Sequence, residues 1–168
     1  MKINLKDCNI RLGTPNDIYQ IAEVYAASIR QLCSNDYCHK TIDKWAKSTP
    51  AHSRLQDINN GSLWVAEVDE KIIGYLVSVP GELLELFINP EYSGIGLGAR
   101  LGELGIELAQ QNHASPVLLE STINAAPFYE KLGFKEVSRG VFSHGESSFS
   151  IPVVNMVLSG VIKSKPVN

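Results

Sequence analysis

Residues 83–100 read LLELFINPEYSGIGLGAR, an apolar strand-like run followed by a turn in which Gly94, Gly96 and Gly98 alternate. Apolar residues recur at helical spacing after the turn and predict a helix over residues 97–111. Backbone N–H groups at a helix N-terminus attract anions, and residues without a Cβ let a phosphate approach the chain closely. The segment therefore predicts a strand, a turn and a helix that together can bind an anion.

Three interpretations of this turn differ in the ligand they imply. A nucleotide triphosphate loop is excluded, because no Gly-Lys-Ser/Thr sequence follows the glycines. A dinucleotide-binding turn stays open, since Gly94, Gly96 and Ala99 match its pattern and Glu120 stands where a ribose-binding acid belongs. A glycine turn with a purely structural role is the third interpretation.

A second informative segment, residues 121–134, reads STINAAPFYEKLGF and predicts a short helix. Its spacing places Ala125, Phe128 and Leu132 on the face that packs against the core. Tyr129 lies about 100° round the helix from Phe128. We therefore expect the Tyr129 side chain to leave the core face.

The rest of the chain predicts alternating strands and helices without a break between domains. Strands are expected at residues 9–12, 63–68, 72–79, 83–88, 117–119, from 134, and at 149–158, with helices after a capping box at residues 14–17 and at 41–47. Glycine costs helix stability, so Gly102 and Gly105 in the 97–111 helix are expected to serve close packing. Pro152 predicts a sheet edge or a bulge in the last strand.

In the order of these elements the chain resembles the GNAT superfamily of N-acetyltransferases, from about residue 9 to residue 158. The strand, turn and helix of residues 83–108 carry this resemblance, together with the run Asn124-x-x-x-Phe128-Tyr129-Glu130-Lys131-Leu132-Gly133-Phe134. The resemblance implies one α/β (α+β) domain over residues 1–168, with helices on both faces of a mixed, mostly antiparallel sheet of about seven strands. Residues 161–168 are expected to form a loose tail.

The resemblance also implies direct transfer of an acetyl group from acetyl-CoA to an amine in a ternary complex, without an acyl-enzyme. Acetyl-CoA would be bound mainly through the backbone of the turn, at Ser93, Gly94, Ile95, Gly96, Leu97, Gly98 and Ala99. Ser93 stands where the family usually has Arg or Gln. The sheet is expected to splay beside residues 83–88, and the backbone at Phe87 or Ile88 to stabilise the carbonyl oxygen. Asn124 is expected either to bond the pantetheine arm or to cap the following helix.

Two side chains are the candidates for acid–base chemistry. Tyr129 is expected to protonate the leaving thiolate, whose pKa lies near the ~8.5 of a free thiol. Glu85 is the expected base for the attacking amine, with Glu120 as its rival. Strand alternation places Glu85 on the face opposite the apolar side chains at positions 84, 86 and 88.

For the acceptor, the family's architecture nominates Tyr37, Trp45 and His144 as lining residues. The acceptor is expected to be the amine of a small molecule or a peptide, and the acidic residues near the groove favour a cationic small molecule. The four histidines lack the paired spacing of metal ligands, so no metal site is expected.

Bulk properties narrow the class of partner. The formal net charge is −3, which gives no attraction to nucleic acid or to anionic lipid. No apolar run approaches the roughly 18 residues of a membrane-spanning helix, so a cytoplasmic protein without a membrane partner is expected. A homodimer through a sheet edge or the last strand is compatible with the pattern. Two other functions stay open: a non-catalytic acyl-CoA-binding module, and a small dinucleotide-binding oxidoreductase.

Overall fold

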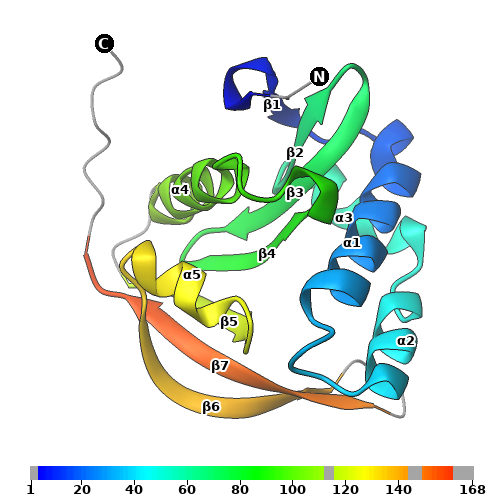
Figure 1. Cartoon of the computed structure of the whole chain (residues 1–168). Coiled ribbons are helices and arrows are strands. Elements are labelled where there is room, and N and C mark those ends of the chain that lie inside the picture. The colour runs from blue at the N-terminus through cyan, green and yellow to red at the C-terminus, as the bar shows by residue number, and fades with distance from the viewer. Residues whose placement is uncertain (1–3, 112–115, 144–148, 161–168) are drawn as a thin grey trace.

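The computed structural model describes residues 4–111, 116–143 and 149–160 (Figure 1). The helices are α1 (Ile18–Leu32), α2 (His39–Lys47), α3 (Leu55–Asn59), α4 (Leu97–Gln110) and α5 (Ala126–Lys131). The strands are β1 (Asn9–Leu12), β2 (Leu63–Val68), β3 (Lys71–Val79), β4 (Glu82–Ile88), β5 (Val117–Thr122), β6 (Lys135–Ser143) and β7 (Ser150–Leu158).

The strands of the described residues form one seven-stranded sheet in the order β1-β2-β3-β4-β5-β7-β6. Neighbouring strands are antiparallel except β4 and β5, which run parallel. Helices α1 and α2 cover one face, and α4 and α5 cover the other (Figure 1). The expected α/β domain with a mostly antiparallel sheet is confirmed. This sheet is not the doubly wound parallel sheet of a dinucleotide-binding domain.

Two elements differ from the sequence-based expectation. Strand β5 runs on to Thr122, three residues beyond its predicted end, because it pairs with β7 over its whole length. Helix α3 was not predicted, because its five residues are too few to show a helical period. Its buried side chain, Ile58, joins the core cluster that α1 and α2 form with the sheet.

The glycines of α4 let this helix lie close to its neighbours, as expected. A Cβ on Gly102 would lie 2.5 Å from Leu132 Cδ1, and a Cβ on Gly105 would overlap the Leu83 side chain. Each contact is too short for a real Cβ, so a larger residue would require the leucine side chain to move or α4 to shift away from β4 and α5. The N-terminus of α4 is therefore held at a fixed place beside β4.

A β-bulge at Leu84 corrects the predicted faces of β4. Val77 pairs with Glu85 and Ser78 with Leu83, which leaves Leu84 without a partner on β3. Leu86 and Ile88 belong to the cluster packed beneath α4, as predicted. Leu84 instead lines the same cavity as Glu85, on the other face, and is 43% exposed. Simple alternation fails at this position because the bulge adds one residue.

Strands β4 and β5 splay apart, as the family resemblance implied. Their ladder contains one pair, Glu82 with Leu118, at the beginning of both strands. Beyond that pair, β4 is bonded only to β3 and β5 only to β7 among the described strands. One edge of β4 is therefore open from Leu83 to Ile88.

The predicted bulge at Pro152 is absent, and the predicted sheet edge is found only locally, on the side of β5. Strand β7 lies inside the sheet, between β5 and β6, and its register with β6 is regular at the pair Val141–Pro152. The last pair of β7 with β5 is Val153 with Thr122, so β5 has ended where it would face Pro152. A proline is tolerated there because no residue of β5 needs a hydrogen bond from a backbone N–H at this position.

None of the helices in the described part of the chain has the length and the apolar character needed to cross a membrane.

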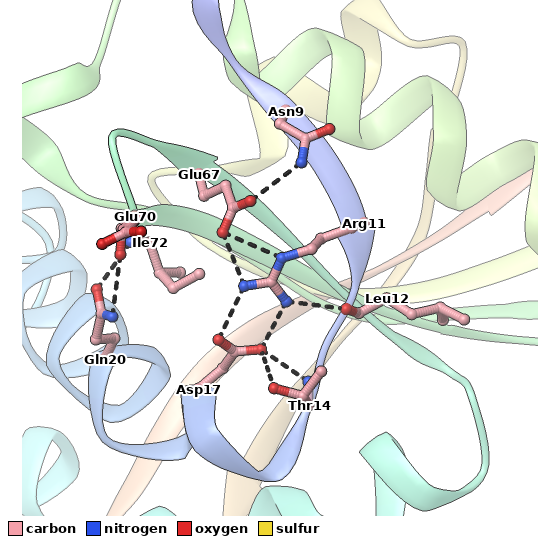
Figure 2. A network of polar contacts seen from close by, with 9 residues as sticks. All are labelled: Asn9, Arg11, Leu12, Thr14, Asp17, Gln20, Glu67, Glu70 and Ile72. Atoms are coloured by element: carbon pink, nitrogen blue, oxygen red, sulfur yellow. Dashed lines mark hydrogen bonds and ion pairs between the residues drawn. The ribbon is translucent and has the colours of Figure 1, made fainter.

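A partly buried ion-pair network joins β1, β2 and the start of α1 (Figure 2). The Arg11 guanidinium donates to both carboxylate oxygens of Asp17, at 2.8 and 3.0 Å, and to Oε2 of Glu67 at 2.8 Å. Asp17 also accepts from the Thr14 backbone N–H at 2.7 Å, which completes the predicted capping box. The hydrogen bonds from Arg11 hold the pKa of Asp17 below its ordinary value. The network fixes the edge strand to α1, away from the open edge of β4.

Replacing Arg11 by methionine is expected to lower the free energy of unfolding by about 1–3 kcal/mol near pH 7, because the buried Asp17 carboxylate loses the cation that pairs with it. Since the folded-state pKa of Asp17 is lowered, its contribution is present above the unfolded pKa, about 3.9, and is lost as the pH falls through the folded pKa. Urea unfolding should therefore show a smaller difference between wild type and variant at about pH 3 than at about pH 7.

The matched control is Lys47→Met, which breaks the exposed ion pair with Asp43 and should change stability by less than about 0.5 kcal/mol. Equal losses from the two variants, or an Arg11→Met loss that does not depend on pH, would contradict this role of the network.

Candidate active site

The turn between β4 and α4 leaves a row of backbone N–H groups free. Gly94 and Gly96 have φ angles of 83° and 89°, which glycine adopts without strain, and Gly96 is the N-cap of α4. No backbone hydrogen bond to another described residue is formed by the amides of residues 94–99, and the next amide, of Arg100, bonds to Gly96. The arrangement can bind an anion such as a phosphate at the N-terminus of α4.

A groove of about 370 Å³ follows the open edge of β4. This β4 groove is lined by Leu86, Phe87 and Ile88 of β4, Gly98 of α4, Cys33 after α1, and Thr122, Asn124, Phe128 and Tyr129 of β5 and α5. The Asn89 N–H bonds to Ile73 of β3, so alternation along the strand turns the Ile88 N–H toward the groove. The groove therefore offers a backbone donor on its β4 side.

Asn124 brings an acceptor with no partner to the β4 groove. Its Oδ1 atom is buried and accepts no hydrogen bond from the described residues. The neighbouring Cys33 thiol interacts with the Asn124 side chain. Burial raises the pKa of this thiol to about 12, so it stays protonated at neutral pH. A buried acceptor without a donor is costly, and a ligand carrying an amide N–H would satisfy it.

The structure corrects the predicted orientation of Tyr129. The prediction that this side chain leaves the core face is wrong: Tyr129 is 7% exposed and packs edge-on against Phe128 and Phe134. The neighbouring Phe128 is only half-buried. Its ring lies over Gly98 and Gly102 of α4. The Tyr129 hydroxyl has no hydrogen-bond partner among the described residues, and the side chain lines the β4 groove. Burial raises the pKa of the phenol above its ordinary value.

A second cavity, of about 400 Å³, lies on the face of the sheet that α1 and α2 cover. This glutamate cavity is lined by Glu82, Leu84, Glu85, Phe87, Glu120 and Thr122 of β4 and β5, by Tyr25, Trp45, Thr49 and Arg54 above them, and by Phe142, Ile151 and Val153 of β6 and β7. Its walls are mostly aromatic and aliphatic. Its charged groups are three carboxylates and one guanidinium.

The charges of the glutamate cavity are unequally paired. Glu85 Oε2 accepts from the Tyr75 hydroxyl at 2.8 Å and pairs with Arg54 Nη2 at 2.9 Å. Burial raises the pKa of Glu85, although Arg54 opposes this shift. Burial and the nearby Glu82 raise the pKa of Glu120. No ion pair to a described residue is formed by Glu82 or Glu120, so the unpaired charge of the cavity is negative.

The two cavities meet where β4 and β5 have separated. Phe87 and Thr122 line both of them, one from each strand. A group lying in the β4 groove can therefore come close to a group lying in the glutamate cavity. On the same face of each strand, Glu85 precedes Phe87 by two residues, and Glu120 precedes Thr122 by two.

The structure distributes the sequence-predicted residues unevenly. Tyr129, Phe87, Ile88, Gly98 and Asn124 line the β4 groove, and Glu85 and Trp45 line the glutamate cavity. Ser93, Gly94, Ile95, Gly96, Leu97 and Ala99 form the turn and the first residues of α4, outside both linings. Tyr37 lines neither cavity, and His144 lies outside the described residues.

Sequence reasoning missed Arg54, Thr122 and Tyr25. Arg54 comes from a short 3-10 turn at Ala51–Arg54 that has no recognisable pattern. Thr122 belongs to the part of β5 beyond its predicted end. Tyr25 lies on the core-facing side of α1, and its ring contacts Phe87 and lies under the Arg54 guanidinium.

Comparisons with known proteins agree on one family. The acetyltransferase (GNAT) domain family matches residues 33–159. YafP, an uncharacterised N-acetyltransferase of Escherichia coli strain K12, is 23% identical over 135 residues, which cover 80% of this chain and 86% of that protein. A GCN5-related N-acetyltransferase from Rhodopseudomonas palustris superposes with a TM-score of 0.76 at 22% identity, over 95% of this chain and 99% of that one.

A second solved structure, the PaiA N-acetyltransferase of Thermoplasma acidophilum in complex with coenzyme A, superposes with a TM-score of 0.71 at 20% identity, over 91% of this chain and 99% of that one. The family match includes the turn before α4, both splayed strands and α5. The chain belongs to the GNAT acetyltransferase family and is an N-acetyltransferase that takes its acetyl group from acetyl-CoA.

Proposed function

We propose that the acceptor is a small amine with an apolar body and a second positive charge, and that it meets the acetyl donor between Phe87 and Thr122. The observation that carries this proposal is the shared wall of the two cavities. The β4 groove takes the donor and the glutamate cavity takes the acceptor. Each substrate then has its own entrance, which suits direct transfer in a ternary complex.

The donor is bound mainly by backbone groups and by Asn124. The free amides of residues 94–99 bind the pyrophosphate of acetyl-CoA, which explains why Ser93 suffices where the family has a long polar side chain. The unpartnered Asn124 Oδ1 accepts from an amide of the pantetheine arm. The Ile88 N–H faces the groove and stabilises the charge that develops on the acetyl oxygen. Acetyl-CoA supplies the thioester, and these residues hold it in place.

Tyr129 donates a proton to the departing sulfur. This role is supported by its place in the β4 groove and by its hydroxyl, which no other described residue engages. Its raised pKa keeps the phenol protonated at neutral pH, as a general acid must be before the reaction. Packing against Phe128 and Phe134 fixes the direction of the ring.

Glu85 removes the proton from the attacking amine, directly or through a water molecule. Its carboxylate is held by Tyr75 and Arg54, so it is fixed in place before the acceptor arrives. Glu82 and Glu120 have no such partners and attract the second positive charge of the acceptor. Because Arg54 is already paired with Glu85, the described residues that line the cavity offer no free cation to an acceptor carboxylate. Amino acids are therefore poor acceptors compared with diamines and arylalkylamines.

Tyr129→Phe is expected to lower kcat by about 10²–10³-fold, because the leaving thiolate loses its proton donor. The dissociation constant of acetyl-CoA, measured by isothermal titration, should change less than about threefold, since the ring and its packing remain. Tyr19→Phe, on the exposed side of α1, is the matched control and should keep wild-type kcat. Unchanged turnover in Tyr129→Phe would remove this residue from the mechanism, and binding of acetyl-CoA without turnover of any amine would support a non-catalytic binding module.

Substitutions of Glu85 and Glu120 by glutamine are expected to separate the base from the charge site. Glu85→Gln should lower kcat with every amine and abolish the acid limb of the pH profile of kcat/KM, which reports the base being protonated below its raised pKa. Glu120→Gln should raise KM for a diamine about 5–10-fold and leave KM for the matching monoamine within about twofold. The acceptor assignment fails if an amino acid is the better substrate, or if Glu120→Gln affects diamine and monoamine equally.

A further inference from the structure

The hydroxyl of Tyr37 joins three parts of the chain that are far apart in the sequence. Tyr37 lies between α1 and α2, is 8% exposed, and packs edge-on against Trp45 with 5.6 Å between ring centroids. Its hydroxyl donates to the Pro152 carbonyl oxygen at 2.8 Å and accepts from the Ile123 N–H at 3.0 Å. One buried side chain thereby holds the residue after β5 and the first part of β7 at a fixed separation.

The Tyr37 hydroxyl takes the place of the next residue pair in the β5–β7 ladder. The register ends at Thr122 with Val153, so its continuation would pair Ile123 with Pro152. A hydrogen-bonded antiparallel pair exchanges two N–H···O bonds, and Pro152 has no N–H to give. The Tyr37 hydroxyl lies between the Ile123 N–H and the Pro152 carbonyl, the two groups that the remaining bond would join. It satisfies both and keeps the strands apart at this point.

The two anchored residues each stand beside one of the substrate sites. Ile123 precedes Asn124, a lining residue of the β4 groove whose buried Oδ1 accepts no hydrogen bond from the described residues. Pro152 stands between Ile151 and Val153, which line the glutamate cavity. We propose that Tyr37 is a positioning residue: its hydroxyl holds the backbone at Ile123 so that Asn124 presents its oxygen to the acetyl donor. The inference rests on the proposed function of the groove.

A second contact supports Asn124 from the same segment. The Tyr37 N–H donates to the Cys33 carbonyl at 3.2 Å, and the Cys33 side chain interacts with the Asn124 side chain. Burial raises the pKa of Tyr37, so its hydroxyl can donate and accept across the whole neutral range. Tyr37, which was expected to line the acceptor site, thus acts on Asn124 from outside both cavities.

Tyr37→Phe keeps the ring and its packing on Trp45 but leaves the buried Ile123 N–H without an acceptor. The expected result is a dissociation constant for acetyl-CoA raised about 5–10-fold, measured by isothermal titration, because Asn124 loses its fixed position. Tyr19→Phe, an exposed tyrosine on α1, is the matched control and should bind like the wild type. In the wild type, the Ile123 amide should exchange with deuterium as slowly as the β5 amides, although it lies outside the strand.

A double-mutant cycle with Asn124→Ala tests the route of the effect. If Tyr37 acts through Asn124, Tyr37→Phe should change the dissociation constant less than about twofold in the Asn124→Ala background. Fast exchange of the Ile123 amide, unchanged binding in Tyr37→Phe, or effects of the two substitutions that simply add would each overturn the inference. Failure of the wild type to bind acetyl-CoA would instead overturn the proposed function, so the two failures are distinguishable.

Discussion

Strands β4 and β5 are neighbours in the sheet and yet share one pair, Glu82 with Leu118. Every buried backbone polar group needs a partner, so an open edge along β4 is tolerated only where water or a ligand reaches it. That edge forms the wall of the β4 groove, and the widening gap joins the groove to the glutamate cavity at Phe87 and Thr122. The helices packed against the sheet keep this gap open and supply the polar side chains and backbone amides that surround it.

Packing around the gap explains residues that would otherwise look unfavourable. Glycines in α4 weaken the helix but let it lie close to β4, which brings the free amides of its N-terminus to the mouth of the groove. Pro152 inside β7 breaks no hydrogen bond of the sheet, because the Tyr37 hydroxyl lies between β5 and β7 at the point where these strands separate. Burial of Glu85 beside Arg54 leaves Glu82 and Glu120 as the unpaired charges of the cavity.

The fold and the donor side of the site could be predicted from the sequence, because they depend on local patterns. Strand, turn and helix around Gly94 and Gly96 follow from glycine conformations and apolar periodicity, which one segment contains in full. On the acceptor side, Glu85 and Trp45 were predicted, but Arg54 and Thr122 were not, because these two reach the cavity through contacts between distant segments. Local rules also failed at the Leu84 bulge, and for Tyr129, whose side chain packs between Phe128 and Phe134 in the core.

The most direct test of the account is isothermal titration with acetyl-CoA, with NAD as the control ligand. The account predicts saturable binding of acetyl-CoA by the wild type and its loss in Gly96→Val, because valine cannot adopt the φ of 89° that shapes the turn. Gly61→Val carries a similar strain, at a φ of 69°, in the turn before β2 and should still bind. Binding of NAD but not of acetyl-CoA, or undiminished binding by Gly96→Val, would contradict the account.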